Sequence, residues 1–599
     1  PYVDKEFGTG CVKITPAHDP NDFEVGKRHN LEEIVILNDD ATINVPGPYF
    51  GMDRYEARKA MVEDLKEQGL LVKVVPHSHN VGTHDRCGTT VEPMVKPQWF
   101  VRMDEMAKPA IEALKTGKLK FVPESFGKTY LHWLEGIRDW CISRQRAWGV
   151  PIPIFYNEDG TPIMEKAVFE HVADLFREHG SNIWFEKDAK ELLPEGYTNP
   201  ASPNGEFTKE TDTMDVWFDS GSSHTGAMIE RGLGYPADLY FEGSDQYRGW
   251  FNSSLIVGTA VHGQAPYKQV LSHGFVMDGK GVKMSKSQWN AVAPGEITKK
   301  YGADILRLWA ASVDYQADCS MSEEILKQIS ENYRKVRNTF RFLLANINNE
   351  DDFTKADLVA VSELPKLDQY MLALLDEVNA KCQLAYQEYR FSDVTTLLTN
   401  LMTNEFSAYY LDFTKDILYI EKKDSPRRRQ VQTVLYHAVN VLVRLWAPIL
   451  VHTAEEVNDF FKGEEESIHL GRFAEPFNIA DAEALKAKIG RLMQIRSDIF
   501  KALEEARAEK VIGKSLEAEV LVNVSDEDRA LIAELCGDQF HQWLIVSKVS
   551  FSIDELKPYD VCQVEIVKAE GTVCPRCWNI SDQADEEGLC PRCRKVLGL

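Results

Sequence analysis

Between Asp139 and about Asp318, short runs rich in β-branched and aromatic residues alternate with helical runs, and this alternation limits the fold more than any other feature. Strands that alternate with helices are typical of α/β domains with a parallel sheet. Within this region, residues 156–212 contain clusters of Gly, Pro and Asn, which predict an insertion. After Ser322, apolar residues spaced by three and four predict a bundle of long amphipathic helices that ends near residue 480.

The chain has 599 residues, enough for several domains, and 44% apolar residues can supply a core for each. A helix from Ala484 to Lys510 leads into β-like runs at Glu517–Val524 and Val546–Ile553, which predict a separate C-terminal module. The chain lacks both a run of about eighteen apolar residues and a charged-then-apolar leader, so we expect a soluble, cytoplasmic protein with no membrane partner. Because the residues from Pro1 onward read like the middle of a domain, we also expect a fragment.

A loop at Lys283–Ser287 places two lysines in a polar segment after a strand-like run, Gln269–Met277, and a turn at Asp278–Gly281. Lysine ammonium groups bind phosphate, and two of them can neutralise the charge that develops as pyrophosphate leaves. A solvated Lys/Ser loop is the alternative, because five residues are a short match.

Three further stretches of this region carry groups that can bind a ligand. Asp215–Ser222 places a carboxylate and a small-residue turn at the end of an apolar run, where an open α/β sheet binds its ligand, and Glu242–Trp250 contains acids, an amide and two glycines. Asp215–Ser222 can equally be a strand-end turn, and Glu242–Trp250 can equally be a helix start capped by Asp245. Acids suit an amino group and ribose hydroxyls, and glycines let a backbone approach a ligand. The third stretch, Asp139–Gln145, contains an arginine that can anchor an acid across the site.

Together with the loop, these stretches resemble the class I aminoacyl-tRNA synthetases, and residues 139–599 resemble the isoleucyl branch of that family. The resemblance implies that Glu242, Gly243, Asp245 and Gln246 bind the aminoacyl-adenylate. It also implies that Lys283 and Lys286 are catalytic, and that Lys286 and Ser287 bind the phosphates of ATP, which enters with Mg²⁺. The family usually continues the loop with Ile-Gly-Asn, whereas this chain has Gln288-Trp289-Asn290.

The His-x-Gly-His motif, which holds ATP in the first half of this family's nucleotide-binding fold, does not occur in the chain. We therefore expect that this fragment alone does not activate an amino acid.

Two matching Cys-x-x-Cys knuckles stand near the C-terminus, separated by twelve residues. Four thiolates at this spacing can surround one tetrahedral ion, so zinc is the expected occupant. The four predicted ligands are Cys574, Cys577, Cys590 and Cys593. Because all four positions would be filled by protein, the zinc would be structural. A pair of disulfides is the alternative, which a reducing cytoplasm disfavours.

The first 138 residues resemble the editing insertion of valyl-tRNA synthetases, from Gly8–Asp22 through Pro97–Phe100. We therefore expect a hybrid sequence, natural or artefactual, with its junction at Asp139–Gln145. Four polar side chains here can hold a mischarged amino acid and a hydrolytic water: Lys13, Thr15, Asp19 and Asp22. The expected target is threonine attached to tRNA. Alternatively, the acids cap a helix that begins near Asn21. A weaker zinc candidate combines His77, His79, His84 and Cys87.

The net charge of −25 argues against a protein that coats nucleic acid non-specifically, but local basic surfaces are enough for an enzyme that reads RNA shape. Candidate contacts to tRNA are the basic residues Arg334, Lys335, Arg337, Arg341, Lys422, Lys423 and Arg427–Arg429. Candidate stacking residues are Tyr409, Tyr410 and Tyr436. Most such charge runs are solvated helix faces, which is the alternative.

The predicted architecture is therefore multidomain α/β. Residues 1–122 would form a remnant of a β-rich editing insertion and its connection, residues 123–322 the second half of a Rossmann-type catalytic domain, residues 323–480 an anticodon-binding bundle, and residues 481–599 a C-terminal module with zinc knuckles at 574–593. The expected function is an N-terminally truncated isoleucine–tRNA ligase with hydrolytic editing, monomeric, whose partners are tRNA, isoleucine and ATP. A valine–tRNA ligase or hybrid, and a non-catalytic tRNA-binding protein, are the alternatives.

Overall fold

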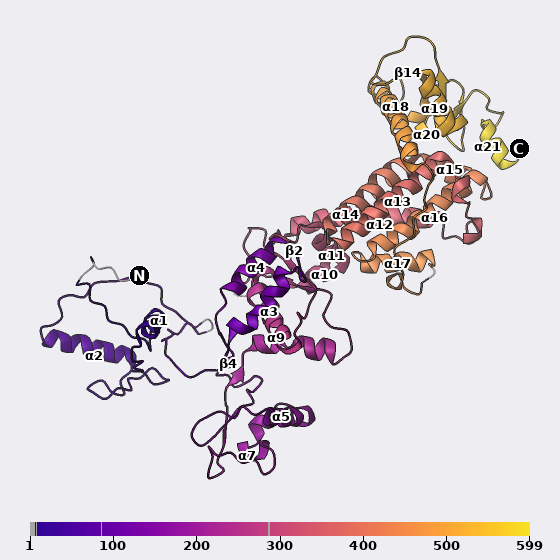
Figure 1. Cartoon of the computed structure of the whole chain (residues 1–599). Helices are drawn as coiled ribbons and strands as arrows, with labels where there is room; N and C mark the ends of the chain where they lie inside the picture. The colour runs from indigo at the N-terminus through magenta and orange to yellow at the C-terminus, as the bar shows by residue number, and fades with distance from the viewer. Residues whose placement is uncertain (1–5, 7–8, 85–86, 286–287, 464) are drawn as a thin grey trace. The chain divides into compact units, whose positions relative to one another are not determined.

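The computed structural model describes residue 6 and residues 9–84, 87–285, 288–463 and 465–599 (Figure 1). The chain divides into two compact units. Unit 1 contains Pro1–Tyr240 and Asp245–Val270, and unit 2 contains Phe241–Ser244 and Leu271–Leu599. Among the described residues, every helix is too short or too polar to cross a membrane.

The N-terminal part of unit 1 has two helices, α1 (Pro20–His29) and α2 (Arg54–Glu67), joined by irregular chain. Before Phe100, the β structure of the described residues consists of isolated bridges such as Leu37 with Ile43. This segment was predicted to be rich in β-strands, but its described residues form no regular strand. Residues 72–75 are rich in valine and would suit a strand, but no apolar surface packs against them, and Val72 is 94% exposed.

Three helices of unit 1 pack around one core: α3 (Met103–Lys115), α4 (Ser125–Glu135) and α9 (Trp250–His262). The largest fully buried side chains of this core are aromatic, including Tyr130, Tyr247 and Phe251. Helix α9 is apolar nearly all round, and eight of its residues are buried, as expected of a helix inside a domain.

The segment predicted as an insertion has its own small core, which includes Phe155 and Trp184. Its helices are α5 (Lys166–His179), α6 (Ile183–Glu186) and α7 (Ala189–Leu192). Two antiparallel ribbons lead into and out of it: β4 (Ser143–Arg144) with β7 (Thr213–Met214), and β5 (Phe155–Tyr156) with β6 (Thr208–Lys209). A lobe that leaves and rejoins the chain at one place brings its two ends together in opposite directions, so these pairs are antiparallel.

Other strands lie near the stretches expected to bind ligands. One sheet has the order β2 (Lys120–Val122), β9 (Gln269–His273), β8 (Tyr240–Gly243). In unit 2, β10 (Val276–Met277) pairs with β11 (Cys319–Ser320) in parallel, with Val276 opposite Cys319. This parallel pair agrees with the α/β pattern predicted for the region.

Unit 2 continues as the predicted helical bundle, which shares one apolar core with the C-terminal module. Its principal helices are α12 (Glu323–Ala345), α13 (Lys366–Gln387), α14 (Phe391–Asn400), η5 (Leu401–Tyr410), α15 (Leu411–Ile420), α16 (Pro426–Trp446) and α17 (Val451–Phe461). The spacing by three and four correctly predicted α12, which buries Val336 and Phe340 on its inner face.

The C-terminal module begins with α18 (Ala482–Ala508), close to the helix expected from the sequence. A three-stranded sheet follows, in which β12 (Ala518–Asn523) lies between β13 (Lys548–Phe551) and β14 (Gln563–Lys568). Alternate residues of β12 are buried, because one face of this strand packs on the core. Helices α19 (Asp526–Cys536) and α20 (Phe540–Leu544) connect β12 to β13, and α21 (Pro591–Leu597) ends the chain.

Candidate functional site

The lysine loop emerges from a hairpin in unit 2. The Met284 N–H donates to the Val276 carbonyl over 2.9 Å, and the Asp278 N–H donates to the Val282 carbonyl over 2.8 Å. The Asp278 carboxylate closes the turn by accepting from the Val282 and Lys280 N–H groups at 3.0 and 2.9 Å. The bond from Val282, then those from the Asn290 side chain and from Lys280, lower the pKa of Asp278. Main-chain and side-chain hydrogen bonds therefore hold the base of the loop.

Asn290 ties the far end of the loop to this base. Its Nδ2 donates to Asp278 Oδ2 over 3.0 Å and to the Lys283 carbonyl over 3.2 Å, while its Oδ1 accepts from the Ser285 N–H over 3.0 Å. In the sequence, Asn290 stands out only as part of the family pattern that follows the loop, which assigns it no role. Asn290 follows the loop and Asp278 opens the turn before it, and this pair of polar residues was the signal in the sequence that could have indicated the contact.

The Lys283 ammonium lies 3.2 Å from the centroid of the Phe275 ring, a cation–π contact that holds the side chain beside β10. Lys286 and Ser287, expected to bind ATP, lie outside the described residues. Trp289 has a φ of 56°, the left-handed conformation that glycine adopts readily, and its side chain is 94% exposed. The backbone here thus has the shape that the family's usual glycine permits.

Just before the hairpin, the backbone at Gly274 passes very close to the backbone at Ala317. A Cβ atom on Gly274 would lie 2.3 Å from the carbonyl carbon and oxygen of Ala317, so a side chain cannot fit without movement of the backbone. Gly274 also donates its N–H to the Tyr315 carbonyl over 2.9 Å. Glycine is therefore required where the chain passes from β9 to β10.

The four residues expected to bind the adenylate occupy the end of β8 and the turn after it. Glu242 is exposed and Gly243 is buried. Asp245 accepts from Gln246 Nε2 over 3.2 Å, and Gln246 Oε1 accepts from the Trp250 N–H over 2.9 Å. The alternative interpretation was that Asp245 caps the helix that starts here. The side-chain oxygen at the start of α9 instead comes from Gln246.

In unit 1, Arg144 anchors an acid, as the sequence suggested, and the acid is Asp215. Arg144 Nη2 lies 3.0 Å from Asp215 Oδ2, and the same oxygen accepts from Trp140 Nε1 over 2.9 Å. Asp215 also caps α8 (Val216–Gly221) by accepting from the Trp217 N–H. Burial, and then repulsion from Asp215, raise the pKa of Asp219 to about 6.

Arg144, Asp215 and Asp219 line a hollow of about 910 Å³ in unit 1. Arg146, Trp148 and Phe185 border it together with Asp215 and Asp219. Trp148 is 91% exposed. The hollow combines cationic, anionic and aromatic groups.

The four residues expected to edit lie together but bond mainly to one another. Asp19 caps α1 by accepting from the Asn21 and Asp22 N–H groups. Asp22 accepts from the Thr15 N–H over 2.7 Å and from the Thr15 hydroxyl over 3.1 Å. Lys13 Nζ lies 3.3 Å from Thr15 Oγ1. The helix-cap alternative therefore applies to Asp19, and Asp22 has a structural role in holding Thr15.

The weaker metal candidate near residue 80 does not form a cluster in the part of the chain that the structure describes. Only His84 and Cys87 meet, with Nδ1 and Sγ 3.4 Å apart, while His77 stacks on His79.

The four C-terminal cysteines converge. Their sulfur atoms all lie within 4.8 Å of one another, and all four residues are buried. A tetrahedral ion with bonds of about 2.3 Å to sulfur needs sulfur atoms roughly 3.8 Å apart, and Cys577 and Cys590 are 3.6 Å apart. All eleven cysteines of the chain are free thiols, so the disulfide alternative is not supported. The residues present thus fit a closed metal site.

Two arginines hold these knuckles against the end of the helical bundle. Arg576 Nη2 donates to the Ile420 carbonyl over 2.6 Å, and Arg592 forms ion pairs with Asp416 and with Glu421, the latter at 2.7 Å.

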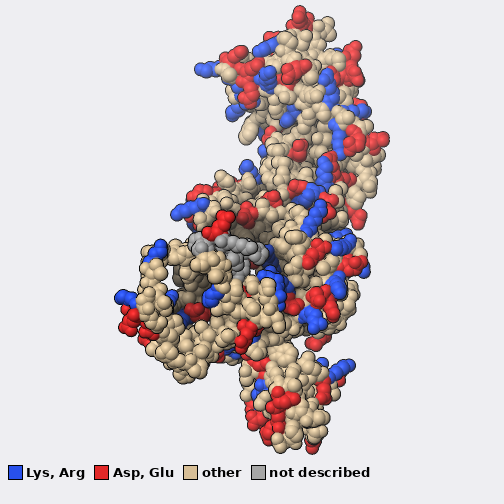
Figure 2. Space-filling view, turned by 60° about the vertical axis from the view of Figure 1, so that its left-hand side comes forward, with Lys and Arg blue, Asp and Glu red and all other residues tan. Residues whose placement is uncertain are grey.

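The arginine run proposed for tRNA contact is internal, not a solvated basic face. Arg427 pairs with Asp368, whose side chain is fully buried, and Arg428 pairs with Asp352 at 2.6 Å. Tyr409 and Tyr410 are 4% and 0% exposed, so the prediction that they stack on bases is wrong. Figure 2 shows Lys and Arg side chains interspersed with Asp and Glu over the face in view.

Comparison with known protein families matches two parts of the chain. The family described as tRNA synthetases class I (I, L, M and V) matches residues 14–322, about half of the chain. The anticodon-binding domain of tRNA ligases matches residues 368–522.

Individual relatives match the whole chain. It is 49% identical to an isoleucine–tRNA ligase of Geobacillus kaustophilus (strain HTA426) and 50% identical to one of Geobacillus thermodenitrificans (strain NG80-2). Each alignment covers 100% of this chain and 66% of the relative, so the chain spans just under two thirds of their length. The alignments include the first 138 residues, so a junction at Asp139–Gln145 is not needed to account for the match. A solved leucyl synthetase–tRNA complex from Agrobacterium radiobacter K84 is 17% identical, with a TM-score of 0.44 over 94% of this chain and 59% of that chain.

Proposed function

Because the chain belongs to the class I tRNA synthetases, we propose that it is part of an isoleucine–tRNA ligase, which joins isoleucine to ATP as an adenylate and transfers the acyl group to tRNA. The observation that carries this proposal is identity of about 49% to isoleucine–tRNA ligases over the entire chain. A cytoplasmic location and a monomeric state belong to the same proposal.

The roles of the loop residues follow from charge and position. Lys283 and Lys286 would balance the negative charge of the phosphates as pyrophosphate leaves. Asn290 would hold the Lys283 carbonyl and the Ser285 N–H, and so keep the loop attached to the hairpin. Glu242, which is exposed at the end of β8, would bind the amino group of the adenylate.

We assign zinc to the four cysteines, because four thiolates match its preferred tetrahedral set and leave no open position for substrate. The ion would join the two knuckles, and Arg592 would hold the resulting module on α15. Its role would be structural, and the module would pack on α15, which lies inside the region, residues 368–522, that matches anticodon-binding domains.

The test is aminoacylation by a protein extended to the length of its relatives. Transcripts that accept isoleucine and transcripts that accept valine are offered with each labelled amino acid. The proposal expects isoleucine on the isoleucine acceptor, with Lys286→Ala greatly reduced. Charging only of the valine acceptor would establish the valyl alternative, and tRNA binding without any charging would establish the non-catalytic one.

Hydrolytic editing remains a second proposed activity, located in the first 138 residues. One methylene separates isoleucine from valine by only about 1–3 kcal/mol, the general case for which synthetases need a second sieve. Lys13, Thr15, Asp19 and Asp22 are the proposed residues, although Asp19 already caps α1. The test is hydrolysis of threonyl-tRNA and valyl-tRNA by wild type and Asp22→Ala.

A further inference from the structure

The contact between Lys283 and Phe275 follows from the register of the hairpin. Met277 forms an antiparallel β-bridge with Lys283, so the two side chains lie on the same face. Phe275 stands two residues before Met277, and alternate residues of a strand share a face. The Lys283 ammonium therefore reaches diagonally to the Phe275 ring and lies 3.2 Å from its centroid.

The main chain holds Phe275 on both sides. The Phe275 N–H donates to Asp318 Oδ1 over 2.7 Å, and the Phe275 carbonyl accepts from the Cys319 N–H over 2.9 Å. Lys283 is an exposed residue whose long side chain has many rotamers in solvent. The ring is thus a fixed surface that restricts where the ammonium lies.

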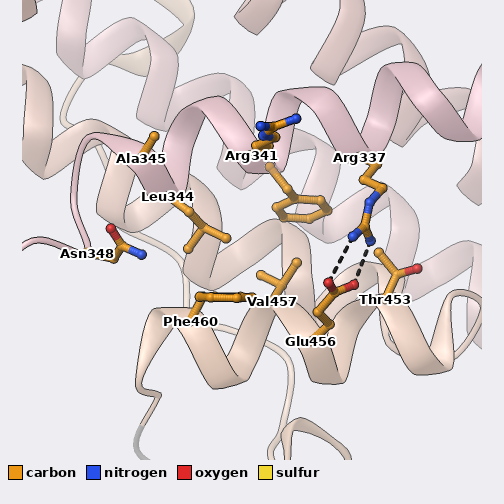
Figure 3. Close-up of a pocket in the computed structure, with 10 residues that line it drawn as sticks. Arg337, Arg341, Leu344, Ala345, Asn348, Thr453, Glu456, Val457 and Phe460 are labelled. Carbon is orange, nitrogen blue, oxygen red and sulfur yellow. Dashed lines mark hydrogen bonds and ion pairs between the residues drawn. The ribbon is translucent and has the colours of Figure 1, made fainter.

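The ring holds this ammonium without neutralising it. Within the part of the chain that the structure describes, the Lys283 ammonium has no hydrogen bond or ion pair. Other cations of unit 2 bond to acids: Arg337 to Glu456 at 2.6 and 2.8 Å (Figure 3), and Lys300 to Glu323 at 2.5 Å. An aromatic face attracts a cation through its quadrupole and carries no net charge. The full charge of Lys283 therefore remains available to an anion.

We propose that Phe275 is a positioning residue for the reaction, because it holds the Lys283 ammonium in place for the charge that develops as pyrophosphate leaves. The inference rests on the proposed function, since it assumes that ATP is a substrate. A group that is already restricted before the reaction loses less entropy in the transition state. A carboxylate partner would restrict Lys283 equally well, but it would compete with the phosphate for the ammonium.

Phe275 also packs, and a test has to separate this role from positioning. Its side chain lines an apolar hollow of about 540 Å³ together with Trp309 and Phe391. Leucine keeps an apolar side chain at this position and removes the aromatic face, whereas tyrosine keeps both. Positioning of Lys283 requires the ring, and packing requires only apolar volume.

The experiment measures ATP–pyrophosphate exchange, dependent on isoleucine, by the protein at the length of its relatives. The variants are Phe275→Leu and Phe275→Tyr. The matched control is Phe23→Leu, the same change beneath Lys27, whose ammonium lies 4.4 Å from the Phe23 ring in the N-terminal part of unit 1. Thermal unfolding of each variant establishes that it is folded.

We expect Phe275→Leu to lower kcat roughly two- to fivefold, the change that loss of one exposed cation–π contact produces. The KM for ATP should change little, because the contact acts on charge that develops only in the transition state. Phe275→Tyr and Phe23→Leu should match wild type. In a Lys283→Ala background, Phe275→Leu should have no further effect, since the ring then has no ammonium to hold.

A second readout does not depend on activity. Acetic anhydride acetylates lysines of the full chain, and mass spectrometry reports the extent at each one. Phe275→Leu should raise acetylation of Lys283 roughly two- to fivefold and leave Lys280, an exposed lysine of the same hairpin, unchanged.

Three results would overturn the inference alone: unchanged acetylation of Lys283, a Phe275→Tyr variant as slow as Phe275→Leu, or an equal loss of rate with and without Lys283. Absence of isoleucine-dependent exchange in wild type would instead contradict the proposed function, and the role of Phe275 with it.

Discussion

Replacement of Asp368 by Asn tests whether the arginine run on α16 is a structural element of the bundle. Asp368 is fully buried, accepts from the Tyr410 hydroxyl over 2.8 Å, and pairs with Arg427 through both terminal nitrogens. Burial lowers the pKa of Arg427, but Asp368 and Tyr410 together raise it by more, so the net shift is upward and the arginine remains charged. Asparagine keeps the shape of the side chain and removes its charge, which leaves that cation uncompensated.

The expected cost follows from this burial. Removal of one partner of a buried ion pair costs about 3–5 kcal/mol. At about 1.4 kcal/mol for each factor of ten, amides of α13 and α16 should exchange with solvent roughly 100- to 4000-fold faster than in wild type. Hydrogen–deuterium exchange followed by mass spectrometry resolves these helices separately from the rest of the chain.

The matched control is Asp412→Asn, which breaks an exposed pair with Lys415, 3.1 Å long and about 46% exposed on each side. Such pairs contribute about 0–1 kcal/mol, so exchange in α15 should change less than about fivefold. If Asp368→Asn were no more damaging than this control, the arginine run would not be a structural element.

Three further predictions concern the loop and the two candidate sites. Asn290→Ala removes three hydrogen bonds, so the Ser285 amide should exchange at least tenfold faster, whereas Gln288→Ala should leave it unchanged. Cys593→Ser should lower bound zinc, measured by metal analysis, from about one ion per chain, whereas Cys562→Ser, a buried thiol outside the knuckles, should not. Asp219 has a pKa raised from 3.8 to about 6, so its ionised form destabilises the fold as pH rises through this window; Asp219→Asn should therefore raise the melting temperature at pH 8 and not at pH 4.

The sequence predicted best those features that depend on local spacing. Apolar residues three and four apart placed α12, and two Cys-x-x-Cys pairs identified the four cysteines that converge. Both signals are periodic or closely spaced, so they do not depend on distant parts of the chain.

Features that depend on distant partners were beyond the sequence. Arg427 and Arg428 looked like a solvated basic run, because their acids, Asp368 and Asp352, stand 59 and 76 residues earlier. The burial of Tyr410 follows from the same packing. Likewise, the residue anchored by Arg144 is 71 positions away, and spacing along the chain could not identify it.

The measurement that tests the central claim most directly is ATP–pyrophosphate exchange, dependent on the amino acid, by the protein at the length of its relatives. An isoleucine–tRNA ligase should exchange with isoleucine far faster than with valine, by roughly 10- to 200-fold for one methylene, and should lose this activity with Lys286→Ala. Exchange that is faster with valine, or absent with both amino acids, would contradict the assignment.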